Sequence, residues 1–282
     1  MASLKDTRKR IAVVQNTQKI TKAMKLVSSS KYVKANQAAS QAQAYGQGLG
    51  ACLGALPSQL LELEQPLWSP GNSQAPRLLV VLSPKGGLCG GLGAALWKKA
   101  QELGSGGALG EDTVYILWGK SPLKEEKGGA VWDCGEKPPL AKGASWCAQQ
   151  LASLRALFLE GKVRSVHLLY GGYKNALSQE PSWETLLPLA KPSSPVQGFS
   201  PHLEEKGELF LEGLLDRVLE ERLRAILLES ELAEHAARMT AMDCATKNAD
   251  QVIKDLTLEL NRERQRAITT ELIEITSGAQ AL

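Results

Sequence analysis

The chain has 282 residues, a formal net charge of +3 and an aromatic content of only 5%. So small a net charge gives no argument for nucleic-acid binding, and no stretch reaches the roughly 18 uncharged apolar residues of a membrane helix. Five cysteines without metal-ligand spacing indicate reduced thiols in a cytosol-like compartment. No apolar run follows the first residues, so we expect neither a secretory signal nor a transit peptide.

Residues 1–60 are expected to form one long amino-terminal helix, because the segment contains no proline before Pro57 and no glycine before Gly46. Its apolar residues are diluted by Gln, Lys and Thr, which predicts a narrow apolar seam rather than a wide core face. The predicted seam contains Ile11, Val14, Ile20, Met24 and Val27. Nine basic side chains accompany a single acidic one, Asp6, which indicates an acidic partner.

Residues 76–201 alternate between strand and helix patterns after a connector at 57–74 that is rich in Pro, Ser and Gly. Apolar runs predict buried strands at 77–83, 113–118 and 163–170, with a possible fourth at 184–189. Helices are expected through Trp97 and Leu103 and over 145–160. This alternation predicts a small α/β, Rossmann-like domain with a largely parallel sheet.

Residues 203–282 are expected to form a second long helix, because 214–277 contain neither glycine nor proline. A helix of that length exceeds what so small a domain can cover, and it therefore needs a partner helix. The economical solution is an antiparallel coiled coil of the two chain ends, with the α/β domain inserted between them. The predicted seam of this helix runs through Leu211, Leu214, Leu215, Val218, Ile226, Leu232, Ala236, Met239, Met242, Ala249, Ile253, Leu256 and Ile268.

A glycine loop at 85–93 follows a predicted strand and opens a helix, where phosphate-binding turns lie in nucleotide folds. Its spacing matches neither the dinucleotide fingerprint nor a P-loop, which favours a structural turn. An alternative is a stand-alone α/β enzyme with Cys89 as nucleophile, but such a thiol needs a base. The histidines are His167, predicted in a strand, His235, predicted in the long helix, and His202. No cluster predicts a metal or cofactor.

Four segments resemble the gamma subunits of F-type ATP synthases. They are the amino-terminal helix at 11–24, the Gly-Leu-Cys-Gly-Gly-Leu loop at 87–92, the stretch at 236–249 and the closing signature at 261–279. They occur in the family's order, so the resemblance covers essentially the whole chain. The residues Gly87, Cys89, Gly90 and Gly91 correspond to the family's turn in the foot domain.

The resemblance implies a rotating central shaft without an active site, in which ATP chemistry occurs on other subunits. The implied partners are the alpha and beta subunits of a hexamer, the epsilon subunit and the membrane c-ring, which proton or sometimes sodium flow turns. No nucleic acid or cofactor is implied, and membrane association is indirect, through the ring. We expect a peripheral protein on the cytoplasmic side of a bacterial inner membrane.

Five residues correspond to positions through which the family contacts beta subunits: Met24, Lys25, Arg238, Arg264 and Gln265. The resemblance places Met24 level with Arg238, which would leave roughly the last 20 residues of the second helix unpaired.

The chain departs from the family pattern at three places. Ser83-Pro84-Lys85-Gly86 replaces a Ser-x-Asp-Arg stretch before the glycine loop, and Ser28-Ser29-Ser30 replaces an Ala-rich stretch. Asp243 stands where lysine is common, which reverses a charge beside Arg238.

Overall fold

The computed structural model describes residues 4–57, 60, 62–63, 65–69, 71–110, 112–119, 131–133, 143–191 and 207–280. The chain divides into two compact units. The helical unit consists of Met1–Ser29 with Arg238–Leu282, and the sheet unit consists of Ser30–Ala237. The two long helices pass through both units, and each unit is described by itself.

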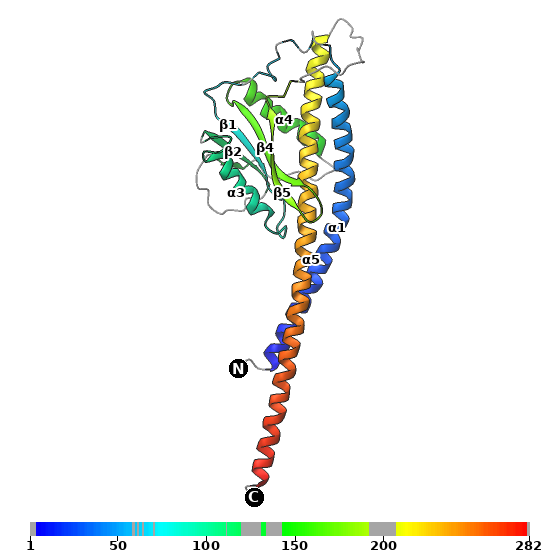
Figure 1. Ribbon diagram of the computed structural model, residues 1–282, viewed down its shortest axis with the longest axis vertical. Helices are drawn as coiled ribbons and strands as arrows, with labels where there is room; N and C mark the ends of the chain where they lie inside the picture. The colour runs from blue at the N-terminus through cyan, green and yellow to red at the C-terminus, as the bar shows by residue number, and fades with distance from the viewer. Residues whose placement is uncertain are drawn as a thin grey trace. The chain divides into compact units, whose positions relative to one another are not determined.

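The elements follow one another as two long helices at the chain ends with alternating strands and helices between them (Figure 1). In chain order they are α1 (Leu4–Gly54), β1 (Arg77–Leu82), α3 (Leu92–Gly104), β2 (Thr113–Trp118), β3 (Val131–Asp133), α4 (Gly143–Leu159), β4 (Ser165–Tyr173), β5 (Gln179–Leu187) and α5 (Gly207–Gln280). This order confirms the predicted fold class of long terminal helices with a small, mostly parallel sheet between them.

The described strands form one five-stranded sheet in the order β3-β2-β1-β4-β5. The first four strands are mutually parallel, and β5 pairs antiparallel with β4 at the edge. Strand β3 was missed because three residues are too few to show a pattern. Strand β5 begins earlier than the expected 184–189 because its first residues are half-exposed and polar, as an edge strand permits.

Helices cover both faces of the sheet, which explains the continuous apolar run of β1. On one face, α4 and the early part of α5 pack against alternate strand residues such as Leu78, Val80 and Leu168. On the other face, α3 packs against Leu79, Val81 and their neighbours. The fully buried α5 residues on the first face recur every four positions: Leu211, Leu215, Leu219 and Leu223. Burial of these leucines contributes to the unit's hydrophobic stabilisation.

In the helical unit, α1 and α5 pair along covered positions that recur at alternating spacings of three and four. On α1 these are Leu4, Thr7, Ile11, Val14, Gln18, Thr21, Lys25 and Ser28. On α5 they are Met242, Thr246, Ala249, Ile253, Leu256, Leu260, Glu263 and Ala267. The alternation averages about 3.5 residues per repeat, the heptad period of a left-handed coiled coil.

Several predicted seam residues lie outside this seam. Ile20 and Val27 are 60% and 57% exposed, and Ile268 is 45% exposed. The prediction followed the apolar residues, whereas the heptad period continues through polar ones, so Gln18, Thr21 and Lys25 occupy the covered positions instead.

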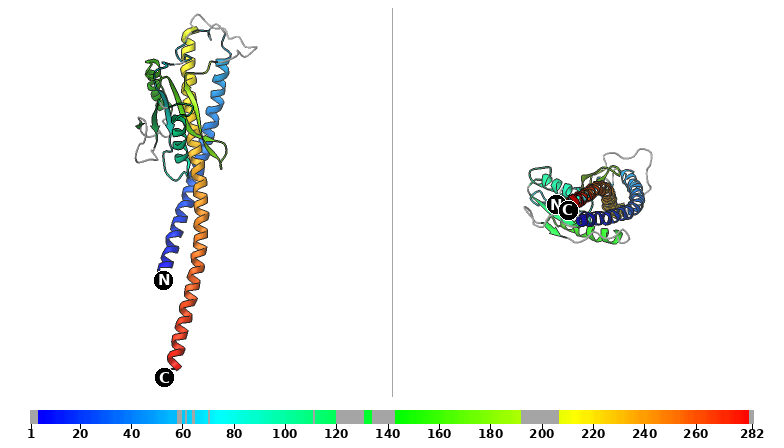
Figure 2. Two further views of the ribbon diagram at one scale, coloured as in Figure 1. Left: turned by 60° about the vertical axis from the view of Figure 1, so that its left-hand side comes forward. Right: turned by 90° about the horizontal axis from the view of Figure 1, so that it is seen from below.

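The pairing is antiparallel, but its register differs from the expected one. Thr7 bonds Glu263 and Lys25 bonds Asp243, so partner numbers fall on α5 as they rise on α1. Met24 is therefore level with Cys244 and not with Arg238, a shift of about two helical turns. Figures 1 and 2 show the end of α5 continuing past the start of α1. This register shortens the unpaired end below the expected 20 residues.

Candidate functional site

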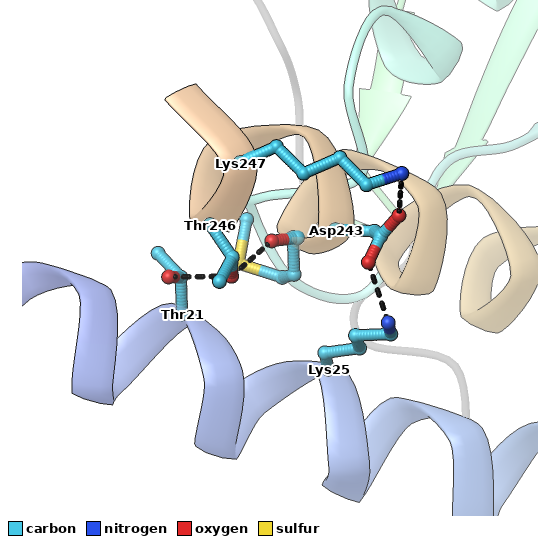
Figure 3. Close-up of polar contacts among 6 residues, drawn as sticks. Thr21, Lys25, Asp243, Thr246 and Lys247 are labelled. Carbon is cyan, nitrogen blue, oxygen red and sulfur yellow. Dashed lines mark hydrogen bonds and ion pairs between the residues drawn. The ribbon is translucent and has the colours of Figure 1, made fainter. Parts of the chain in front are cut away.

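A three-residue ion network joins α1 and α5 close to Ser29 and Arg238, at one limit of the helical unit (Figure 3). Lys25 on α1 reaches across the seam to Asp243, with Nζ 2.5 Å from Oδ1. Lys247, one turn along α5, approaches the second oxygen of Asp243 at 2.8 Å. Hydrogen bonds from Lys247 and then Lys25 lower the pKa of Asp243 to about 2. The carboxylate consequently stays ionised across the whole neutral range and bridges two ammonium groups.

Further polar side chains pair across the same seam. Thr21 and Thr246 share a hydrogen bond of 2.9 Å between their hydroxyl oxygens, as Figure 3 shows. The Gln18 amide donates to Asp250, and the Thr7 hydroxyl donates to Glu263 at 3.3 Å. Polar groups at seam positions specify register at some cost in stability. The helical unit therefore fixes its register with polar pairs along much of its length.

The network changes how the predicted contact residues Met24, Lys25 and Arg238 are placed. Lys25 is engaged within the chain, and its neighbour Met24 is half-buried. Arg238 is also half-buried. Asp243 does not simply reverse a charge beside Arg238, because its carboxylate lies between Lys25 and Lys247. The sequence showed the unusual residue but not the partner that compensates for it.

Arg264 and Gln265 lie on the exposed surface of α5, just beyond the contact between Thr7 and Glu263. The backbone carbonyl of Gln265 accepts a hydrogen bond from Thr269, so the helix is regular there. Both side chains point away from the seam positions and are available to a partner.

The outer surface of α1 in the helical unit is both apolar and basic. Val13, Ile20, Leu26 and Val27 are each more than half exposed. Outside the seam, six basic residues accompany one acidic residue in the same stretch: Lys5, Arg8, Lys9, Arg10, Lys19 and Lys22 against Asp6. A grouping of exposed apolar side chains on one helix marks an interaction surface, and the charge balance favours an acidic partner.

In the sheet unit, the glycine loop forms a tight turn between β1 and α3. Gly87, Gly90 and Gly91 are exposed, and Gly90 has a φ of +61° that favours glycine. Leu88 also adopts a positive φ, +65°, with its side chain 54% exposed. A bulky residue in this region is strained and persists only when its surroundings enforce it.

Cys89 is buried in this loop, and its thiol lies 3.6 Å from the carbonyl oxygen of Gly86. A base for Cys89 would have to be a neighbouring histidine. The ring nitrogens of His167, on β4, are instead hydrogen-bonded to Ser165 and Thr185. His235 lies on α5, 3.6 Å from Glu231. Within the described ranges, no group of three or more His, Cys, Asp or Glu residues could hold a metal ion.

The loop is anchored by a carboxylate that the sequence did not reveal. Glu234 on α5 accepts hydrogen bonds from the backbone N–H groups of Lys85 at 3.0 Å and Gly86 at 3.3 Å. Glu234 is only 5% exposed. No spacing in the sequence connects positions 149 residues apart, so only the fold could identify this contact.

Comparison with known proteins agrees with this arrangement. A family model described as ATP synthase matches residues 3–282. The ATP synthase gamma chain of Erythrobacter litoralis (strain HTCC2594) is 39% identical over 294 residues, and that of Phenylobacterium zucineum (strain HLK1) is 37% identical over 294 residues. Both alignments cover 100% of this chain and 100% of the relative.

The fold is also found in a solved assembly. A chain of the Euglena gracilis mitochondrial ATP synthase, OSCP/F1/c-ring, rotational state 3, superposes with a TM-score of 0.66 at 18% identity. That match covers 99% of this chain and 94% of the other chain, and it concerns the fold alone.

The family model that matches residues 3–282 classes the chain, with its two long terminal helices and the α/β domain between them, as a subunit of an ATP synthase. More particularly, the chain belongs to the ATP synthase gamma chain family. The alternative of a stand-alone enzyme built on Cys89 finds no support in these relatives. None of the helices in the described ranges is long and apolar enough to span a membrane.

Proposed function

We propose that this chain is the rotating central shaft of an F-type ATP synthase and carries no catalytic site itself. Ion flow would turn a membrane c-ring, and the ring would turn this subunit inside a hexamer of alpha and beta subunits. The epsilon subunit would be a further partner. We place the complex at a bacterial inner membrane, with this chain peripheral on the cytoplasmic side.

The observation that carries the proposal is the helical unit, in which the two chain ends pair by cross-helix polar contacts. Such pairing satisfies the polar seam internally and leaves an outward surface that is apolar and basic. A protein surrounding the helices could contact this surface from several sides. Membership of the gamma chain family supports the same arrangement.

Arg264 and Gln265 are the residues that we propose to contact a beta subunit most directly, because both are exposed. An arginine can bind a carboxylate through two parallel hydrogen bonds. A charge-assisted hydrogen bond contributes about 1.5–3 kcal/mol, which suits a contact that must form and break in each turn. Met24 and Arg238 could contact a beta subunit only through the smaller, exposed part of each residue. Lys25 could contact a beta subunit only after its ion pair with Asp243 breaks.

The decisive experiment assembles this chain with alpha and beta subunits and the membrane sector, and measures ATP hydrolysis and ATP-driven ion pumping together. The combined substitution of Arg264→Ala and Gln265→Ala should lower turnover or the number of ions pumped per ATP, with normal assembly. Lys254→Ala combined with Gln251→Ala is the matched control, because it removes one cation and one amide from an exposed stretch of the same helix.

An equal loss of ATP hydrolysis or ion pumping in the two double variants would show that the effect is not specific to Arg264 and Gln265. Unchanged hydrolysis and pumping in the Arg264 and Gln265 variant would refute the role of these residues. ATP hydrolysis by the isolated chain, abolished by Cys89→Ser, would refute the proposal that the chain is non-catalytic.

A further inference from the structure

The sheet unit has a reversal of strand order at the carboxyl ends of β1 and β4. The chain passes from β1 to β2 on one side of the sheet, while β4 lies on the other side of β1. Successive strands are therefore added on opposite sides of β1, and the topological switch point of the sheet lies between β1 and β4. In open α/β sheets, ligands bind outside the carboxyl ends of the strands at such a reversal.

In this chain, helix α5 occupies that position with two carboxylates. Glu234 accepts from the N–H groups of Lys85 and Gly86, which follow β1. Glu229 accepts from the N–H group of Tyr173, the last residue of β4, at 3.1 Å. Both strand ends at the reversal are thus bound by side chains of the same helix.

The backbone of β4 is shaped for this close approach. A β-carbon added at Gly171 would lie 3.4 Å from the β-carbon of Ala233 and 3.4 Å from the methyl groups of Leu92. Glycine at this position lets α5 pack directly on the strand, between Glu229 and Glu234.

The chemistry of the contact is that of an anion site. Successive backbone N–H groups in a turn bind phosphate or carboxylate oxygens in many proteins. Here the two oxygens of Glu234 each accept from one of two consecutive N–H groups. The Glu234 side chain is almost fully buried, so a diffusible anion could not bind without displacing it.

We propose that the residues 229–234 of α5 act as an internal ligand of the α/β domain. Glu234 occupies the two successive N–H groups that would otherwise bind a phosphate-like anion, and Glu229 occupies the N–H group of Tyr173. They are positioning residues that fasten α5 to the sheet and hold the strained Leu88 loop in place. The proposal explains why the glycine loop lies at the position where nucleotide folds bind phosphate. In this chain the loop binds a carboxylate of α5 instead.

The first test is amide hydrogen exchange in the full-length chain. Glu234→Ala should accelerate exchange at Lys85 and Gly86 at least about tenfold, because each N–H loses a charge-assisted partner. Glu229→Ala should do the same at Tyr173. Glu212→Ala, which alters an exposed carboxylate of the same helix, is the matched control and should leave all three amides unchanged.

Added inorganic phosphate tests the anion-site part of the proposal. It should slow exchange at Lys85 and Gly86 again in the Glu234→Ala chain and have no effect on the unsubstituted chain. Unchanged exchange in Glu234→Ala, or no response to phosphate in that variant, would overturn the proposal. If Glu234→Ala does not fold, Glu234→Gln decides, since faster exchange confined to Lys85 and Gly86 is expected and uniform acceleration would contradict it.

A second consequence rests on the proposed function. If α5 is fastened to the sheet by these carboxylates, an assembled complex with Glu229→Gln and Glu234→Gln should hydrolyse ATP but pump fewer ions per ATP. Full pumping despite faster amide exchange would show that the internal ligand does not transmit torque. Because the exchange measurements need no partner subunit, they remain valid if the rotor proposal fails.

Discussion

Acidification from about pH 7 to about pH 5 is expected to destabilise the sheet unit through His167 on β4. The imidazole is 7% exposed, with one ring nitrogen bonded to Ser165 and the other to Thr185. Its ring packs edge-on against Trp183, with centroids 5.7 Å apart. Burial, and then the positive charge of Arg77, lower the pKa of His167 from 6.5 to about 4.

The sign of the effect follows from proton uptake. Between pH 6.5 and pH 4 the unfolded chain binds a proton at this imidazole and the folded chain does not. Stability therefore rises with pH in this window and is lost as the pH falls. At about 1.4 kcal/mol per unit of pKa difference, lowering the pH to 5 removes about 2 kcal/mol.

Urea unfolding followed by tryptophan fluorescence measures this effect in the correct unit, because all six tryptophans lie between Trp68 and Trp183. The variant His167→Gln keeps hydrogen-bonding groups but cannot titrate. Between pH 7 and pH 5, the free energy of unfolding should fall less in this variant than in the unsubstituted chain. The difference between the two losses should equal the amount calculated above. Identical losses in both chains, or an NMR titration of the His167 ring near pH 6.5, would refute the reasoning.

Three further predictions concern the core, the seam and the thiols. Leu219→Ala, which removes a fully buried side chain beneath the sheet, should lower the free energy of unfolding by about 3–5 kcal/mol in urea titrations. Lys25→Glu should lower the thermal midpoint of the helical unit by circular dichroism, and adding Asp243→Lys should restore only part of it, because the pair is reversed but Lys247 then lies one turn from a second cation. Burial raises the pKa of Cys147 to about 11, so maleimide at neutral pH should label exposed Cys244 and spare Cys147, as site-resolved mass spectrometry can check.

The sequence predicted the elements whose patterns are local and continuous. The apolar run of β1 indicated a strand buried on both faces because every residue after Arg77 along it is apolar. The long span without glycine or proline before Gly278 predicted α5, since nothing in it interrupts helical hydrogen bonding. Arg264 and Gln265, which the resemblance marked as contact positions, are exposed. Edge strands β3 and β5 were less visible because short or half-exposed strands carry weak patterns.

The sequence by itself determined which segments are helical or extended, that the two long helices must pair, and the family to which the chain belongs. These properties depend on residues close together in the chain. Only the tertiary structure decided the register of the pair, because Lys25–Asp243 and Thr21–Thr246 are side-chain contacts between opposite ends of the chain. It alone decided that Glu234 binds the amides after β1. Such contacts depend on which backbone groups the fold brings within hydrogen-bonding distance, and linear spacing does not record that.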